Sequence, residues 1–229
     1  KVMRHGGGAA VPTRPRLLAA IISAAVDAAD AASGGRVPVT VKMRMGWDHD
    51  SLNAPELAHI AEDLGAKLIT VHGRTRNQMY KGSADWGFVR KVKDAVKLPV
   101  IVNGDICSVE DANQALDLSG ADGVMIGRGA YGRPWLISQV MAALTTGAMP
   151  PDPSVEEQYH IIIRHYHDML AHYGDVTGVN MARKHIGWYT KGLHGSADFR
   201  NAVNQINDPK VVLEMLERFY EPWLSRAAA

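Results

Sequence analysis

Four short runs of apolar and β-branched residues recur at intervals of roughly 30 residues, the spacing of a repeated strand–helix unit. They occupy residues 37–44, 67–74, 98–105 and 121–128, and each one ends in polar or charged side chains. Near-continuous apolar runs of this length are typical of parallel strands that are buried on both faces of a sheet. The pattern therefore predicts four parallel strands with polar carboxyl ends.

Segments with helical spacing of apolar residues separate these runs, at residues 16–32, 54–64, 86–96 and 108–118. Pro55 suits the first turn of the second helix, and Gly65 suits the position after its end. Ser108, followed by Asp111, forms an N-cap pattern for the fourth helix. Alternating strands and helices predict an α/β fold with a parallel sheet, without distinguishing a barrel from a doubly wound sheet.

The strand pattern stops after Trp135, and a proline-rich break follows at residues 150–153. Helical patterns resume at residues 155–173, 178–193 and 210–224. We therefore predict an α/β domain at residues 1–150 and a small helical domain at residues 151–229.

Composition excludes several classes of protein. Hydrophobic residues make up 46% and charged residues 21% of the chain, as in ordinary globular proteins. The sequence contains no apolar run of membrane-spanning length and no signal-peptide pattern at its start. The single cysteine, Cys107, excludes an internal disulfide bond and fits a cytoplasmic location. A net charge of +1 means that a nucleic-acid partner would need a local basic patch.

The polar residues at the strand ends form the candidate site, because ligands of α/β folds bind at the carboxyl ends of the strands. The strands deliver, in chain order, Lys42 with Arg44, His72 with Arg74, Asn103 with Asp105, and Gly127 with Arg128. So many cations on one rim predict a ligand that is negatively charged and accepts hydrogen bonds. Of Lys42 and Arg44, we expect one to face the barrel centre and the other to form a structural pair.

The last two clusters, at residues 103–106 and 127–130, combine small residues with polar ones. Small residues let backbone N–H groups approach a phosphate, and the final two strand-end loops are the usual phosphate site of a TIM barrel. We therefore predict the C-terminal half of a TIM-type (β/α)8 barrel, with four more strands before Lys1. The apolar edges of an isolated half barrel predict dimerisation or domain swapping.

Several motifs occur in an order and at a spacing that resemble one family, the tRNA-dihydrouridine synthases. They are VKMRMG at 41–46, HGRTR at 72–76, YKGSADW at 80–86, NGDI at 103–106 and GRG at 127–129. In addition, ARKHIGWY at 182–189 resembles the tRNA-contacting helix of the bacterial B-type members. The resemblance covers almost the whole chain.

The resemblance implies an FMN-dependent enzyme that uses NADPH to reduce a uridine in the D-loop of tRNA to 5,6-dihydrouridine. It places Lys42 and His72 near the flavin ring. The residues that it assigns to the ribityl chain and phosphate are Asn103, Gly104, Asp105, Gly127 and Arg128. It places Arg44 and Tyr80 near the target uridine, and Arg183 and Lys184 in contact with the tRNA.

The catalytic cysteine of the family is not among these motifs. In the family it precedes a stretch that residues 1–4 resemble, so we expect it before Lys1 and expect the chain by itself to be inactive. Cys107 follows a different strand, and we interpret it as a small buried hydrophobic residue. No metal site is expected: His160, His165, His167 and His172 share one helix, but no cysteine or acidic cluster completes a ligand set.

Two other functions remain open from the residues. The first is another FMN- or phosphate-binding TIM-barrel oxidoreductase that acts on a small metabolite, although such a substrate needs no helical domain. The second is a non-catalytic fragment that binds tRNA or a partner protein, which the absence of the family cysteine favours.

Overall fold

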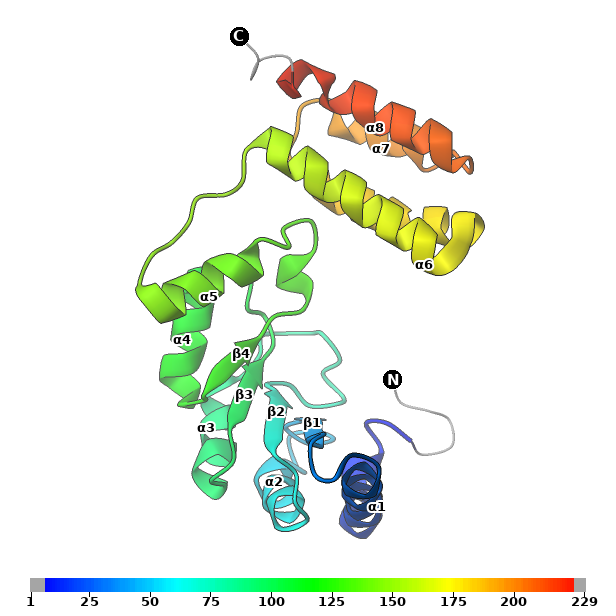
Figure 1. The fold of residues 1–229 in the computed structure, drawn as a ribbon. Helices are drawn as coiled ribbons and strands as arrows, with labels where there is room; N and C mark the ends of the chain where they lie inside the picture. Colours follow the sequence, from blue (N-terminus) through cyan, green and yellow to red (C-terminus); the bar gives the residue numbers. More distant parts are fainter. Residues whose placement is uncertain (1–6, 225–229) are drawn as a thin grey trace. The chain divides into compact units, whose positions relative to one another are not determined.

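The computed structural model describes residues 7–224, and its contacts divide the chain into two compact units (Figure 1). We call Lys1–Gly129 the α/β unit and Ala130–Ala229 the helical unit. The boundary lies before the proline-rich break that the sequence suggested, so one further helix belongs to the helical unit. The segment at residues 1–4, on which the position of the family cysteine was predicted, lies outside the described residues.

The α/β unit contains a four-stranded sheet with the order β1-β2-β3-β4. The strands are β1 (Thr40–Arg44), β2 (Leu68–His72), β3 (Val100–Asn103) and β4 (Gly123–Met125), and every neighbouring pair is parallel. The register places Arg44, His72, Asn103 and Met125 side by side at the carboxyl end of the sheet. The predicted parallel α/β sheet is confirmed, and its register brings the strand-end residues onto one rim.

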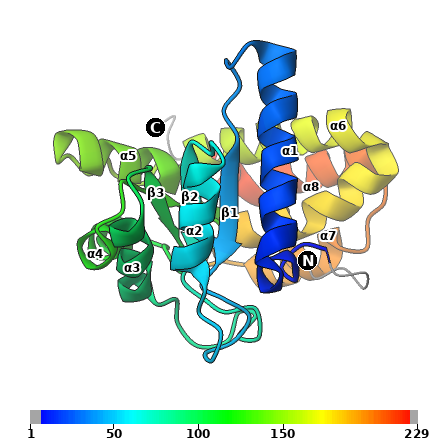
Figure 2. The same ribbon diagram turned by 90° about the horizontal axis from the view of Figure 1, so that it is seen from below.

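Helices alternate with these strands as the apolar spacing predicts. They are α1 (Pro15–Ser33), α2 (Ala54–Asp63), α3 (Trp86–Ala95) and α4 (Val109–Ser119), with short 3-10 turns at Val11–Thr13 and Arg128–Ala130. The Ser108 hydroxyl accepts a hydrogen bond from the Asp111 N–H at 3.0 Å, which confirms the predicted N-cap. Figures 1 and 2 show α2, α3 and α4 side by side along one face of the sheet.

The two faces of the sheet differ in burial. Ile69, Val71, Val100 and Val102 point toward the helices and are fully buried, so they form the core of the unit. The opposite face is only partly covered in the described residues, and Met125 there is 37% exposed. The apolar runs therefore reflect burial on one face, whereas we expected both faces to be buried.

The helical unit contains α5 (Leu136–Thr146), α6 (Val155–Tyr189), α7 (Ser196–Val203) and α8 (Pro209–Leu224). Gly174, with φ 74° and ψ 170°, breaks α6 into the two helices that the sequence predicted there. The core is formed by buried side chains of α6, α7 and α8, including Ile162, Tyr166, Leu216 and Tyr220. None of the helices within residues 7–224 has both the length and the apolar character needed to cross a membrane.

Candidate functional site

Hydrogen bonds between side chains and backbone connect three of the strand ends. The Lys42 ammonium donates to the Asn103 side-chain oxygen at 2.9 Å, and the Asn103 amide nitrogen donates to the Met125 carbonyl at 2.8 Å. Burial, followed by the nearby charge of Arg44, lowers the pKa of Lys42. The ammonium therefore lies on the open face of the sheet with a neutral amide as its hydrogen-bond partner.

Arg44 lies on the same face as Lys42. Its guanidinium donates to the Thr75 carbonyl at 2.7 Å and to the Met79 carbonyl at 2.9 Å, so it holds the loop that follows β2. The expectation that Lys42 and Arg44 would face different ways is wrong, because residues two apart in a strand point to the same side. Two cations consequently lie close together on the rim, and the charge of each disfavours protonation of His72.

His72 lies between these cations and the end of β3. Burial, together with the charges of Arg44, Lys42 and Arg74, lowers its pKa from 6.5 to about 4. The imidazole is therefore neutral at neutral pH and offers one donor and one acceptor. A neutral ring is suited to contact a polar, planar ligand without adding another positive charge.

Gly104 directly follows the β3 end and packs against His72. A Cβ atom at this position would lie 2.9 Å from Cδ2 of His72 and 2.8 Å from Cβ of Ala84, and the φ of Gly104 is +117°. Both the close approach and this backbone conformation require glycine. Gly104 thus allows the loop at residues 80–86 to lie against the strand ends.

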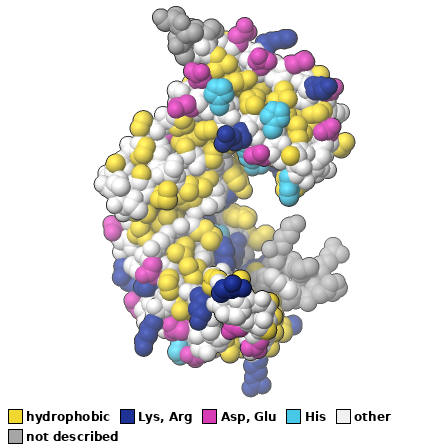
Figure 3. Space-filling view, in the orientation of Figure 1, with side chains coloured by type: hydrophobic (Ala, Val, Ile, Leu, Met, Phe, Trp, Pro, Cys, Tyr) yellow, Lys and Arg dark blue, Asp and Glu magenta, His cyan; other side chains and the backbone are white. Residues whose placement is uncertain are grey.

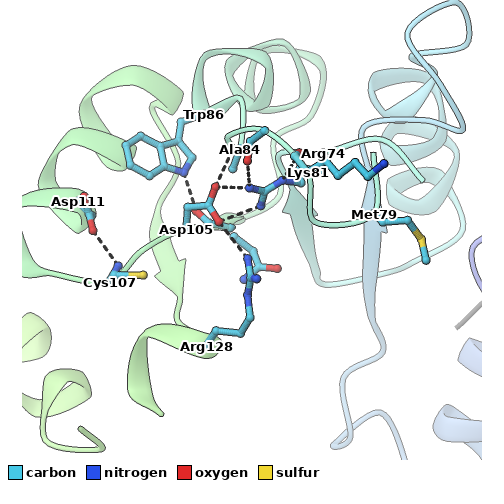
Figure 4. Close-up of polar contacts among 12 residues, drawn as sticks. Arg74, Met79, Lys81, Ala84, Trp86, Asp105, Cys107, Asp111 and Arg128 are labelled. Atoms are coloured by element: carbon cyan, nitrogen blue, oxygen red, sulfur yellow. Dashed lines mark hydrogen bonds and ion pairs between the residues drawn. The ribbon is translucent and has the colours of Figure 1, made fainter. Parts of the chain in front are cut away.

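Asp105 connects the strand ends to that loop (Figure 4). One carboxylate oxygen accepts a hydrogen bond from Arg74 at 2.9 Å and another from Arg128 at 3.2 Å. The other oxygen accepts one hydrogen bond from Arg74 and one from the Ala84 N–H, the latter at 2.8 Å. Arg74 is 2% exposed and also donates to the carbonyls of Lys81 and Gly82, so a buried guanidinium depends on this carboxylate.

Both oxygens of Asp105 are therefore already engaged by protein groups. Burial acts to raise the pKa of Asp105, but the hydrogen bonds from Arg74 and Ala84 and the charge of Arg128 outweigh it, and the pKa is lowered. The residue has φ +54°, which is uncommon for a side chain other than glycine. This geometry indicates that Asp105 positions two arginines. Asp105 does not cap α4, because the N-cap of that helix is Ser108.

Arg128 and Tyr80 form the exposed part of the rim. The Arg128 guanidinium lies 4.7 Å from the centre of the Tyr80 ring, and Arg44 lies 5.8 Å from the same ring. Tyr80 is 61% exposed. An aromatic ring held by two guanidiniums in this way offers a flat surface on which another ring can stack.

The glycines on either side of Arg128 have different surroundings. A Cβ atom on Gly129 would lie 2.2 Å from the Ile106 carbonyl oxygen, so Gly129 is needed for backbone packing. A Cβ atom on Gly127 would meet nothing within 4 Å. Space for a ligand is therefore available next to Gly127 and not next to Gly129.

The rim carries a clear excess of positive charge. Lys42, Arg44, Arg74 and Arg128 lie on it, and Asp105 is the carboxylate that pairs with the last two. Because one carboxylate serves two guanidiniums, the cluster remains cationic. The strand ends therefore suit an anionic ligand with hydrogen-bond acceptors.

Arg74 was expected at the rim without a defined partner and Trp86 was not expected to contribute, yet both shape the site. Trp86 donates its indole N–H to the Gly104 carbonyl at 2.8 Å, and Arg74 makes the contacts described above. The sequence signal for the role of Arg74 is that an arginine and an aspartate follow two neighbouring strands, where they can pair.

The two predicted tRNA contacts lie on α6 in the helical unit. Arg183 donates to the Ile206 carbonyl at 3.1 Å and to the Asn207 side-chain oxygen at 2.7 Å, so it fastens the turn between α7 and α8. Lys184 is exposed. The structure thus gives Arg183 a clear structural role and leaves Lys184 accessible.

Cys107 is exposed, so the expectation of a buried residue is wrong. It lies in the loop between β3 and α4, where its N–H donates to the Asp111 carboxylate at 2.8 Å and its side chain is not drawn into the core. Among the described residues, no group of three or more histidine, cysteine or acidic side chains is arranged to hold a metal ion.

Comparison with known proteins identifies one family. The profile of the dihydrouridine synthase (Dus) family matches residues 1–225. A probable tRNA-dihydrouridine synthase of Rickettsia bellii is 51% identical over 99% of this chain and 68% of its own length. A tRNA-dihydrouridine synthase B of Xanthomonas campestris is 43% identical over 96% of this chain and 65% of its own length. The chain spans about two thirds of the length of these curated relatives.

Among solved structures, a crystal structure of mandelate oxidase matches 89% of this chain and 71% of its own chain. The identity is 17% and the TM-score is 0.31. A likeness this loose supports no argument about fold or ligand.

Proposed function

The chain belongs to the dihydrouridine synthase family. On that premise we propose that it contributes the cofactor-binding and RNA-binding parts of a tRNA-dihydrouridine synthase. The reaction is reduction of a uridine in tRNA to 5,6-dihydrouridine, with FMN as cofactor and NADPH as reductant. The observation that carries the proposal is the strand-end rim, where the cations Lys42 and Arg128 lie with the neutral side chains of His72 and Asn103, in a chain of this family.

The proposed architecture is the C-terminal half of a (β/α)8 barrel followed by a helical tRNA-binding domain. Two features support the half barrel. The four strands follow one another in order and are all parallel, and their open face carries the polar rim while helices cover the other face. The greater length of the relatives is consistent with further strands in the complete protein.

The residues present fit an FMN cofactor. FMN carries an anionic phosphate, and its reduced ring develops negative charge on the N1/O2 side. Lys42, whose partner is a neutral amide, would stabilise that side of the ring, with neutral His72 beside it. Arg128 and the open space at Gly127 suit the phosphate, and Asn103 and Gly104 suit the ribityl chain. Asp105 would take part by holding Arg128 in place.

When bound, FMN supplies the hydride for reduction of the uracil ring. The chain's own residues bind and orient the base. A uridine must leave its stack to reach a buried cofactor, and flipped bases are held by stacking and by hydrogen bonds to their edges. Tyr80 provides the flat surface and Arg44 the donors at this rim. We assign no proton donor to Cys107 and propose that the family's catalytic cysteine precedes Lys1.

The tRNA partner is assigned to the helical unit through Arg183 and Lys184, and a tRNA substrate implies a cytoplasmic enzyme. Arg183 would act mainly by holding the α7–α8 turn, because its guanidinium already has two partners there. Lys184 is free to contact a phosphate, since it is exposed.

Cofactor binding can be tested without turnover. FMN is titrated into the purified protein, and the quenching of flavin fluorescence gives the dissociation constant for the wild type, Lys42→Met and Lys97→Met. Lys97 is an exposed lysine outside the rim and serves as the matched control. We expect Lys42→Met to weaken FMN binding at least tenfold, and Lys97→Met to leave it unchanged. Equal affinity of all three proteins would contradict the assignment of Lys42.

Activity is tested with the full-length protein that contains these residues. It is incubated with FMN, NADPH and tRNA that lacks dihydrouridine, and the modified nucleoside is quantified by mass spectrometry. Dihydrouridine that forms only when NADPH and tRNA are both present supports the proposal. FMN and tRNA binding without any product would instead favour a non-catalytic binding protein.

A further inference from the structure

The helical unit contains a cavity of about 770 Å³ that the proposed reaction does not use. Its volume is in the range of small-molecule sites, about 300–1,000 Å³. It is formed by the segment before α5, by the first turn of α5 and by α6, and all of its lining residues belong to this one unit. The residues that matter for its chemistry are Tyr131, Trp135, Arg164, His165, Asp168 and His185.

One wall of the cavity is a fixed aromatic assembly. Tyr131 stacks on Trp188 with ring centres 4.2 Å apart and planes inclined by 12°. The edge of His185 meets the Trp188 ring at 5.0 Å. A Cβ atom on Gly132 would lie 2.5 Å from the Trp188 carbonyl, so this glycine is required for the close packing. Tyr131 nevertheless remains 48% exposed and is available to a ligand.

The floor of the cavity carries neutral polar groups. His165 and His185 meet edge to face at 4.7 Å, and Nδ1 of His165 lies 3.1 Å from the Tyr189 hydroxyl. Burial lowers the pKa of both histidines, so they are neutral at neutral pH. Neutral imidazoles and a hydroxyl can both donate and accept hydrogen bonds, as the edges of nucleobases require.

Two charged side chains lie one helical turn apart at the cavity wall. Arg164 and Asp168 are both exposed, and in the part of the chain that the structure describes neither forms an ion pair. Figure 3 shows histidine and apolar side chains interspersed over the helical unit, so this surface is not a uniform charged face. An unpaired guanidinium suits a phosphate, and an unpaired carboxylate suits two adjacent N–H donors.

We propose that this cavity is a second nucleotide site, which takes a nucleobase against Tyr131 and the attached phosphate on Arg164. Asp168 favours guanine, because the N1–H and amino group of guanine form a two-donor edge, whereas uracil presents a single N–H. The ligand is either a nucleotide of an RNA strand or a free nucleotide, including the nucleotide part of a dinucleotide cofactor. The inference rests on the cavity alone and not on the reaction proposed above.

The test is isothermal titration of the purified protein with GMP and UMP. Variants Arg164→Ala and Asp168→Asn change exposed side chains and should fold, which circular dichroism verifies. Arg218→Ala removes an exposed arginine of α8 outside the cavity and is the matched control. We expect GMP to bind more tightly than UMP. Arg164→Ala should weaken both at least tenfold, Asp168→Asn should weaken GMP selectively, and Arg218→Ala should change neither.

The source of the nucleotide is decided by two further probes, the trinucleotide UGU and NADPH. Tighter binding of UGU than of GMP, lost in Arg164→Ala, identifies an RNA strand as the occupant. Tighter binding of NADPH with the same dependence on Arg164 identifies the dinucleotide. The proposal is overturned if no probe binds at millimolar concentration, or if binding is the same in Arg164→Ala, Asp168→Asn and the control. In the latter case the nucleotide occupies another site, such as the strand-end rim.

Discussion

Replacing Asp105 by asparagine should destabilise the α/β unit through Arg74. Asparagine tolerates the φ of +54° about as well as aspartate, so the substitution removes charge without adding backbone strain. The buried Arg74 would lose its counter-charge, while its bonds to the carbonyls of Lys81 and Gly82 would remain. The change therefore isolates the electrostatic role of one carboxylate.

The expected cost lies below that of a fully buried pair. Removing one partner of such a pair costs about 3–5 kcal/mol. Arg74 is 2% exposed, but Asp105 is 29% exposed and the amide of asparagine still accepts one hydrogen bond. We therefore expect the free energy of unfolding to fall by about 2–3 kcal/mol. The matched change Asp122→Asn breaks an exposed pair with Lys93 and should cost less than about 1 kcal/mol.

The assay is urea unfolding combined with hydrogen exchange measured by mass spectrometry. Exchange should accelerate most in the peptides that cover residues 79–86, because Asp105 holds that loop through Arg74 and the Ala84 N–H. The pKa of Asp105 is lowered from 3.8 on folding, so its contribution is present above that pH and is lost as the pH falls through the folded-state pKa. A loss no larger than that of Asp122→Asn, or exchange that accelerates uniformly, would refute the reasoning.

Three further predictions concern the rim and the open sheet. Gly129→Ala should lower the free energy of unfolding by about 1–3 kcal/mol, because its Cβ would meet the Ile106 carbonyl. Gly127→Ala should leave the free energy of unfolding unchanged and weaken FMN binding in the fluorescence titration. As the pH falls from 6.5 to about 4, the unfolded chain takes up a proton at His72 that the folded chain does not, so the free energy of unfolding falls. His72→Gln should flatten this part of the pH profile measured by urea unfolding. His59→Gln is the control for the loss of a histidine. The isolated chain should form dimers or larger species in sedimentation analysis because one sheet face is open, and a monodisperse, stable monomer would contradict the half-barrel account.

The strand ends were predictable because parallel strands place their carboxyl ends on one rim. Lys42, His72 and Asn103 each follow an apolar run, and the register brings them together as the alternation of strands and helices implies. The helix ends were predictable for a similar local reason, since Ser108 and Pro55 act within one turn.

The partners of these residues could not be read from the sequence. Asp105 was expected to contact a cofactor, but its bonds go to Arg74, which lies 31 positions away, and to the loop at residues 80–86. The exposure of Cys107 also depends on tertiary packing, because the loop before α4 places the residue outside the core. The helices α5 and α7 were not predicted from the sequence.

The shared carboxylate at the rim has a consequence for ligand affinities. Arg128 contacts both Asp105 and the Tyr80 ring, and Asp105 holds the loop that carries Tyr80. A phosphate that immobilises Arg128 would therefore reduce the conformational entropy that remains to be lost when a base stacks on Tyr80. When one ligand has already immobilised these side chains, the second ligand loses less conformational entropy on binding, so the two bind with positive cooperativity. By linkage, each raises the apparent affinity of the other by the same factor.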